Sequence, residues 1–93
     1  MTAIASEKIK TKAIEELLEM AKTWEEEPGK IQHAIETYER VIGIDPESKE
    51  AERAREALLE IAKRFEKEGK KYSAYYLYQK IGYGREGMSK RPV

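Results

Sequence analysis

Few side chains in this 93-residue chain have the type and spacing that acid–base or metal chemistry needs. The only histidine, His33, has Glu36 and Thr37 nearby, and this grouping makes a surface contact more readily than a catalytic pair. Lys30 stands three residues before it, where a Glu-x-x-His metal motif needs glutamate. Cysteine is absent, and the glycines near the C-terminus precede no helix that could hold a phosphate. The sequence therefore predicts no enzyme, no metal and no cofactor.

Tyrosines form the densest group of informative side chains, close to the C-terminus. Tyrosine combines apolar area with a hydroxyl and is enriched in protein interfaces. We expect these rings to contact a second copy of the chain or another protein. The alternative is that the preceding long helix and a folded-back tail cover them. The cluster consists of Tyr72, Tyr75, Tyr76, Tyr78 and Tyr83.

Apolar residues recur at helical spacing in four stretches. This spacing predicts four helices, which would position the side chains named above. No stretch alternates as a strand does, so the predicted fold is all-α. We expect one helical domain over residues 1–81, with hairpins at about 7–43 and 46–81, and a flexible basic tail at 82–93. The predicted helices run from Ser6 or Thr11 to Glu27, from Lys30 to Ile42, from about Asp45 to just before Gly69, and from Lys70 to Ile81.

Capping signals refine these boundaries. Ser6 or Thr11 offers a hydroxyl for the start of the first helix. Gly43 suits the end of the second helix. Asp45 followed by Pro46 has the order of an N-cap and a first helical residue, which predicts the start of the third helix.

The charge of the chain is balanced overall but unevenly distributed. The 18 basic and 18 acidic residues cancel, so a bulk attraction to nucleic acid is not expected. Residues 1–48 hold 6 Lys or Arg against 11 Asp or Glu, net −5, and residues 49–93 hold 12 against 7, net +5. Abundant Glu and Lys without Asn or Cys is typical of proteins from thermophiles, although helix propensity alone would favour the same residues.

The N-terminal residues 1–12 lack the apolar core of a secretory signal. No later run approaches the roughly 18 apolar residues of a membrane span. These two observations predict a cytoplasmic protein that has no contact with a membrane.

The sequence contains an internal repeat, in which one helical hairpin occurs twice. In the first helix of each pair, Leu17, Met20, Ala21 and Trp24 recur 41 residues later as Leu58, Ile61, Ala62 and Phe65. After the turn the offset is 40, because Pro28 is an extra residue before the first turn glycine. There Gly29, Lys30, Ala34, Tyr38 and Val41 recur as Gly69, Lys70, Ala74, Tyr78 and Ile81. A single hairpin leaves its apolar face open, whereas two stacked hairpins share a core.

These paired residues resemble the tetratricopeptide repeat family over about residues 14–81. The resemblance implies a fragment of a right-handed αα-superhelix made of two hairpins. The repeat departs from the family in its length of 40 rather than 34 residues. It also departs in the second unit, which lacks the proline that Pro46 supplies after the first. An ordinary four-helix bundle is the alternative architecture.

The resemblance implies that a peptide binds in a concave groove lined by the first helix of each pair. Leu18 and Leu59 would grip apolar side chains there, and lysines would neutralise a carboxylate. The alternative is that both leucines widen the core stripe and the lysines pair with glutamates one turn away. The lysines in question are Lys22, Lys63 and Lys67.

We therefore expect a non-enzymatic protein-interaction or assembly module that binds a polypeptide through this inner groove and the tyrosine-rich last helix. A second hypothesis is a homo-oligomeric building block whose acidic front meets the basic back of the next copy. A third is binding of single-stranded RNA by Tyr75, Tyr76 and the basic C-terminal half. The zero net charge argues against the third hypothesis.

Overall fold

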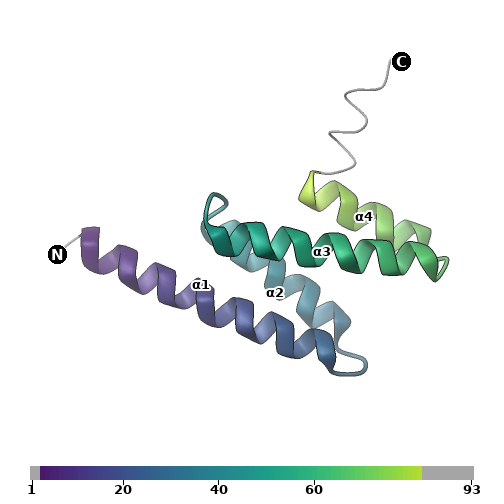
Figure 1. The fold of residues 1–93 in the computed structure, drawn as a ribbon, viewed down its shortest axis with the longest axis horizontal. Coiled ribbons are helices and arrows are strands. Elements are labelled where there is room, and N and C mark those ends of the chain that lie inside the picture. The colour runs from purple at the N-terminus through teal and green to yellow at the C-terminus, as the bar shows by residue number, and fades with distance from the viewer. Residues whose placement is uncertain (1–2, 83–93) are drawn as a thin grey trace, which may run out of the picture. The chain divides into compact units, whose positions relative to one another are not determined.

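The computed structural model describes residues 3–82, with side chains from residue 7 onward, and all its regular secondary structure over this range is helical. The predicted all-α fold of four helices is confirmed (Figure 1). The predicted tail from residue 83 on, including Tyr83, lies outside the described residues. The helices are α1, Ala3–Glu26; α2, Ile31–Ile44; α3, Lys49–Lys67; and α4, Lys71–Ile81.

The chain divides into two compact units. The first, Met1–Ala54, contains α1, α2 and the start of α3. The second begins at Arg55 and contains the rest of α3 together with α4. We call α1 with α2 the first hairpin, and α3 with α4 the second hairpin. The boundary between the units thus falls inside the long helix α3.

In the first hairpin, α1 and α2 bury one apolar stripe each. On α1, Ile14, Leu18 and Ala21 are spaced four and three residues apart and are nearly inaccessible to solvent. On α2, Ala34, Tyr38 and Val41 have the same spacing and are buried to the same extent. Among the helices, α1 and α2 form an extensively packed pair. At the end of the pair away from the turn, Lys10 of α1 lies 3.8 Å from the carboxylate of Asp45.

The second hairpin buries part of the stripe that the repeat predicts, whereas Tyr78 and Ile81 are half-buried. On α3, Leu58, Ile61 and Ala62 are fully buried, and on α4, Ala74 and Leu77 are 2% exposed or less. The equivalents of Leu58 and Ile61 in the first hairpin are less buried, because Leu17 is half-buried and Met20 is exposed. None of the described helices is long and apolar enough to cross a membrane.

Both hairpins turn on a glycine in the left-handed region, Gly29 with φ 77° and Gly69 with φ 84°. This conformation favours glycine because a Cβ would be crowded there. After each turn the next helix begins with the same backbone bond. The amide of Ala34 donates to Lys30 at 3.1 Å, and that of Ala74 donates to Lys70 at 3.0 Å.

Three predicted boundaries were wrong. Ser6 and Thr11 lie inside α1, which begins at Ala3, and Gly43 lies inside α2, which continues to Ile44. The predicted cap of α3 at Asp45 and Pro46 was also wrong, because α3 begins at Lys49. Ser48 caps it: its Oγ accepts a hydrogen bond from the Ala51 amide at 3.0 Å.

Candidate partner-binding site

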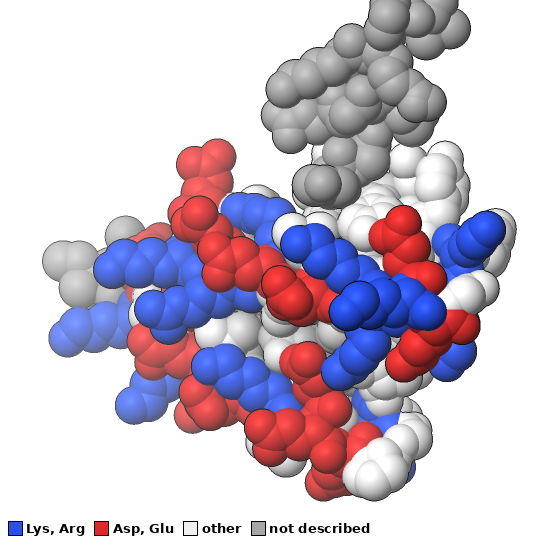
Figure 2. Space-filling view, turned by 45° about the vertical axis from the view of Figure 1, so that its right-hand side comes forward, with Lys and Arg blue, Asp and Glu red and all other residues white. Residues whose placement is uncertain are grey.

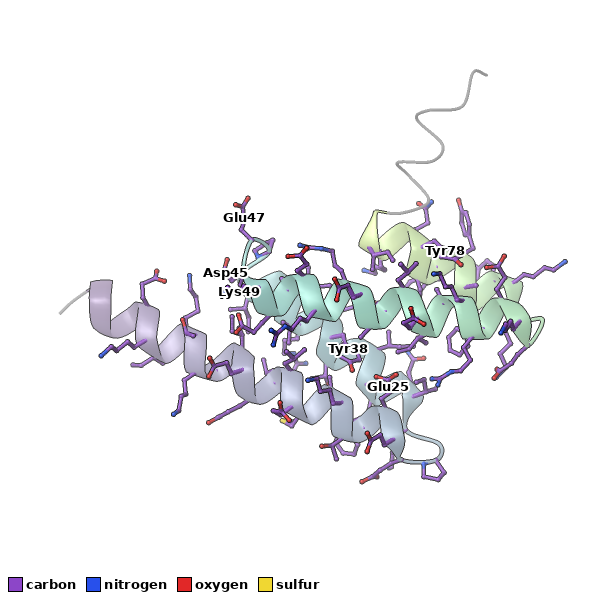
Figure 3. All side chains as sticks on the ribbon, viewed as in Figure 1. Glu25, Tyr38, Asp45, Glu47, Lys49 and Tyr78 are labelled. Atoms are coloured by element: carbon purple, nitrogen blue, oxygen red, sulfur yellow. The ribbon has the colours of Figure 1, made fainter. Side chains whose placement is uncertain are left out.

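Each hairpin contains a hydrogen bond from a tyrosine of its second helix to a glutamate of its first helix. Tyr38 donates to the Glu25 carboxylate at 2.6 Å, and Tyr78 donates to Glu66 at 2.7 Å. The labelled pair Glu25 and Tyr38 can be followed between α1 and α2 in Figure 3. A phenol bound to a carboxylate makes a short, charge-assisted bond that fixes the crossing of two helices. These bonds therefore hold the two helices of each hairpin in the same way.

The two tyrosines differ in their surroundings. Tyr38 is 1% exposed. Burial raises the pKa of its phenol well above the ordinary value, and the hydrogen bond to Glu25 and the charges of Glu25 and Glu26 raise the pKa further. Tyr78 is only half-buried, and its bond to Glu66 is exposed to solvent.

A lysine covers an aromatic ring beside each turn. The Lys30 ammonium lies 5.8 Å from the centre of the Trp24 ring, and that of Lys70 lies 5.5 Å from the Phe65 ring. Both distances are in the range of cation–π attraction. His33 is exposed and its ring centre lies 5.1 Å from that of Trp24, so the only histidine contacts an aromatic surface. Among the described residues, no three metal-ligating side chains come together.

Three tyrosines of α4 point into solvent. Tyr72 is 86% exposed, Tyr75 54% and Tyr76 46%. We call these three residues the tyrosine face. Lys80, one turn after Tyr76, places its ammonium 5.6 Å from the centre of that ring. At the equivalent positions the first hairpin has Gln32, Ile35 and Glu36, of which Ile35 is buried and the other two are exposed.

An open hollow of about 360 Å³ lies beside the tyrosine face in the second unit. We call it the α4 hollow. The rings of Tyr75 and Tyr78 line it with the methyl group of Ala74, and Glu66 and Lys71 add opposite charges. The equivalent residues of the first hairpin are Glu25, Ile31, Ala34, Ile35 and Tyr38, all of which are buried or half-buried.

The predicted groove residues lie in different surroundings. Leu18 is buried, as the alternative of a wider core stripe expects, and Leu59 is half-buried. Lys22 is exposed and lies 3.9 Å from the Glu19 carboxylate, one turn earlier. Leu18 and Lys22 belong to the first unit, whereas Leu59, Lys63 and Lys67 belong to the second. Lys63 and Lys67 are exposed, and a groove shared by all five residues stays a prediction.

The described parts of the two units carry opposite net charge. Residues 3–54 hold eight Lys or Arg against thirteen Asp or Glu, net −5, and residues 55–82 hold seven against four, net +3. Figure 2 shows Lys and Arg interspersed with Asp and Glu over the face in view. Helix α4 itself contains two lysines and no carboxylate.

Sequence reasoning missed the two Tyr–Glu hydrogen bonds. Their partners lie thirteen residues apart in the first hairpin and twelve in the second, on different helices. A signal was present, because both members of the pair recur at the repeat offsets.

Comparisons of the chain with protein-family models, with curated proteins and with solved structures gave no match. The likeness to the tetratricopeptide family therefore depends on the paired residues of the two hairpins alone.

Proposed function

We propose that the chain is a non-enzymatic module of two tetratricopeptide-like hairpins that binds another polypeptide through the tyrosine face of α4. The observation that carries this proposal is the exposure of Tyr72, Tyr75 and Tyr76. At two of these three positions the first hairpin has an exposed polar residue, Gln32 or Glu36. The hairpin therefore does not need an aromatic residue there in order to fold.

The energetics of burial support a role in binding. A fully buried aromatic side chain removes roughly 150–250 Å² from water, and these tyrosines can still bury the 86%, 54% and 46% of their surface that is exposed. Burying apolar area contributes about 25 cal/mol per Å², from which the entropy costs of association are subtracted. The hydroxyl groups add hydrogen bonds that give orientation. Three adjacent rings are enough surface for a weak, specific contact.

Helix α3 adds a second candidate surface within the second unit. Leu59, Lys63 and Lys67 are spaced four residues apart and so lie on one stripe of α3. The half-buried leucine offers apolar area, and the two exposed lysines suit an acidic side chain of the partner. This stripe is the part of the predicted groove that we retain in the proposal.

Selection from a displayed library of random peptides tests the proposal. Peptides selected on the intact chain should bind at least tenfold more weakly to a variant carrying Tyr72→Gln and Tyr76→Glu, which takes the first hairpin's residues at both positions. The matched control carries Gln32→Ala and Glu36→Ala and should bind as the original does. Equal binding by the tyrosine variant, with unchanged helix content, would contradict the proposal.

A further inference from the structure

A second exposed apolar stripe lies on the outer side of α1. Ile9 is 71% exposed and Met20 47% exposed, and Ala13 between them is exposed as well. Spacings of four and seven residues place the three on one side of the helix. The buried residues Ile14 and Leu18 lie on the opposite side. We call Ile9, Ala13 and Met20 the α1 stripe; at 1.5 Å per residue it is about 16 Å long, the length of α4.

The charges around Met20, at one end of the α1 stripe, are opposite to those of α4. A shallow hollow next to Met20 is lined by Lys12, Glu15, Glu16, Glu19, Met20 and Thr23, so three carboxylates and one ammonium surround this end of the stripe. Helix α4 has Lys71 and Lys80 and no acidic residue, and Lys70 precedes it. The Met20 end of the α1 stripe is therefore opposite in charge to α4, and the two surfaces are similar in length.

The α4 hollow also fits what the α1 stripe offers. In the first unit the positions equivalent to those around the hollow are buried or half-buried, and that unit contains a third helical piece, the start of α3. Ala51 and Ala54 of this piece are fully buried. The second unit has only two helical pieces among its described residues, and its hollow is open. A helix supplied by another molecule would take the place that the start of α3 has in the first unit.

We propose that this helix is α1 of a second copy of the chain, whose Met20 enters the α4 hollow. The flexible thioether of methionine fills irregular gaps and makes favourable contacts with aromatic rings, here those of Tyr75 and Tyr78. Glutamates beside the α1 stripe then lie near the lysines of α4. This inference rests on the proposed function, because it assigns a partner to the same tyrosine face.

The contact joins two different surfaces, so it is heterologous. Every copy carries both surfaces, and association therefore continues head to tail unless it closes into a ring. Because opposite charges border the contact, added salt weakens it.

Sedimentation velocity with two blocked variants tests the inference. Met20→Glu blocks the α1 stripe, and Tyr75→Glu blocks the tyrosine face and the hollow. Each variant alone should associate at least tenfold more weakly than the original chain. An equal mixture of the two should form a dimer and nothing larger, because one intact α1 stripe meets one intact tyrosine face. Gln32→Glu, on the exposed side of α2, is the matched control and should associate as the original does.

Three results would overturn the inference. One is an original chain that remains monomeric up to about 1 mM, the weak limit of specific association. Another is a Met20→Glu variant with unchanged helix content that associates as strongly as the original. The third is a mixture of the blocked variants that stays monomeric. Peptides selected on the tyrosine face separate this failure from that of the proposed function: if Met20→Glu still binds them, the face is a binding site and only the assignment of a second copy is lost.

Discussion

Tyr38 and Tyr78 occupy equivalent places in the two hairpins and donate to equivalent glutamates, yet the first is 1% exposed and the second is half-buried. The residues beside the two tyrosines are likewise more exposed in the second hairpin. Ile31 and Ile35 accompany Tyr38, whereas Lys71 and Tyr75 accompany Tyr78. The tyrosine–glutamate hydrogen bond is thus present in both hairpins, whereas the residues beside the tyrosine on the second helix differ. Aliphatic residues suit a covered helix, and tyrosine and lysine suit one that is partly wet and open to a partner.

The largest expected difference between the hairpins concerns the two tyrosine rings. Tyr38→Ala should lower the free energy of unfolding by about 3–5 kcal/mol, as removal of a fully buried ring does. Tyr78→Ala should cost about half as much, because its ring is already partly exposed. Thermal denaturation of both variants measures the difference. Equal losses would mean that the two second helices are equally covered.

The phenol of Tyr38 should make stability depend on alkaline pH. Because its pKa is raised in the folded state, the folded chain keeps a proton that the unfolded chain loses above about pH 10. The stabilisation is complete below pH 10 and is lost as the pH rises from there through the folded-state pKa. At neutral pH, Tyr38→Phe should cost about 1.5–3 kcal/mol, the range for a hydrogen bond to a charged group.

Denaturant unfolding between pH 8 and about pH 11.5 checks this prediction. The difference in the free energy of unfolding between the original chain and Tyr38→Phe should become smaller above pH 10. Tyr78→Phe is the matched comparison, and its solvent-exposed bond should contribute less than about 1 kcal/mol. If this difference does not change with pH, the Tyr38 phenol of the original chain titrates as it does in the unfolded chain.

The turn glycines test the features that the hairpins share. Gly29→Ala and Gly69→Ala should each cost about 1–2 kcal/mol, because alanine is disfavoured at the positive φ of both turns. Gly43 lies inside α2, where an added Cβ meets nothing within 4 Å. Gly43→Ala should therefore stabilise the chain by about 0.5–1 kcal/mol. Urea midpoints of the three variants give the signs directly, and a clear inequality between the two turn variants would argue against equivalent turns.

The smallest predicted effect concerns a difference in helix capping. α3 has a side-chain cap at Ser48, whereas neither Lys30 before α2 nor Lys70 before α4 makes a side-chain cap bond. Ser48→Ala should cost about 1 kcal/mol. Ser73→Ala, on the exposed surface of α4, is the control and should change stability by less than about 0.5 kcal/mol. If the melting temperatures of the two variants fall together, the Ser48 bond has no particular role.

The sequence predicts the helices and their register well, because apolar spacing reports directly which side of a helix is buried. Trp24 and Phe65 align in the sequence and each lies under the lysine that follows its turn. The start of α3 was misplaced because Asp45 and Pro46 carry as strong a local signal as Ser48, and only the backbone decides between them. Gly43 was taken as a helix end because glycine often follows the last helical residue, although α2 continues to Ile44.

The candidate site was predictable only in part. The tyrosines stand out by composition, but exposure depends on which neighbours cover a helix, so the contrast between Ile35 and Tyr75 needed the structure. The Tyr–Glu bonds depend on the angle between two helices, which spacing along one helix does not give. Leu18 shows the converse case: a residue expected at the edge of a groove is buried, since its position between Ile14 and Ala21 places it on the core side of α1.

Hydroxyl-radical footprinting read by mass spectrometry tests the central contrast most directly, one tyrosine at a time. In dilute protein, Tyr72, Tyr75 and Tyr76 should be oxidised rapidly and Tyr38 should be protected. When the chain is concentrated or a selected peptide is added, Tyr75 should become protected while the rate at Tyr38 stays the same. Oxidation of Tyr38 as fast as Tyr75 in dilute protein, or protection of Tyr75 at every concentration, would contradict the account.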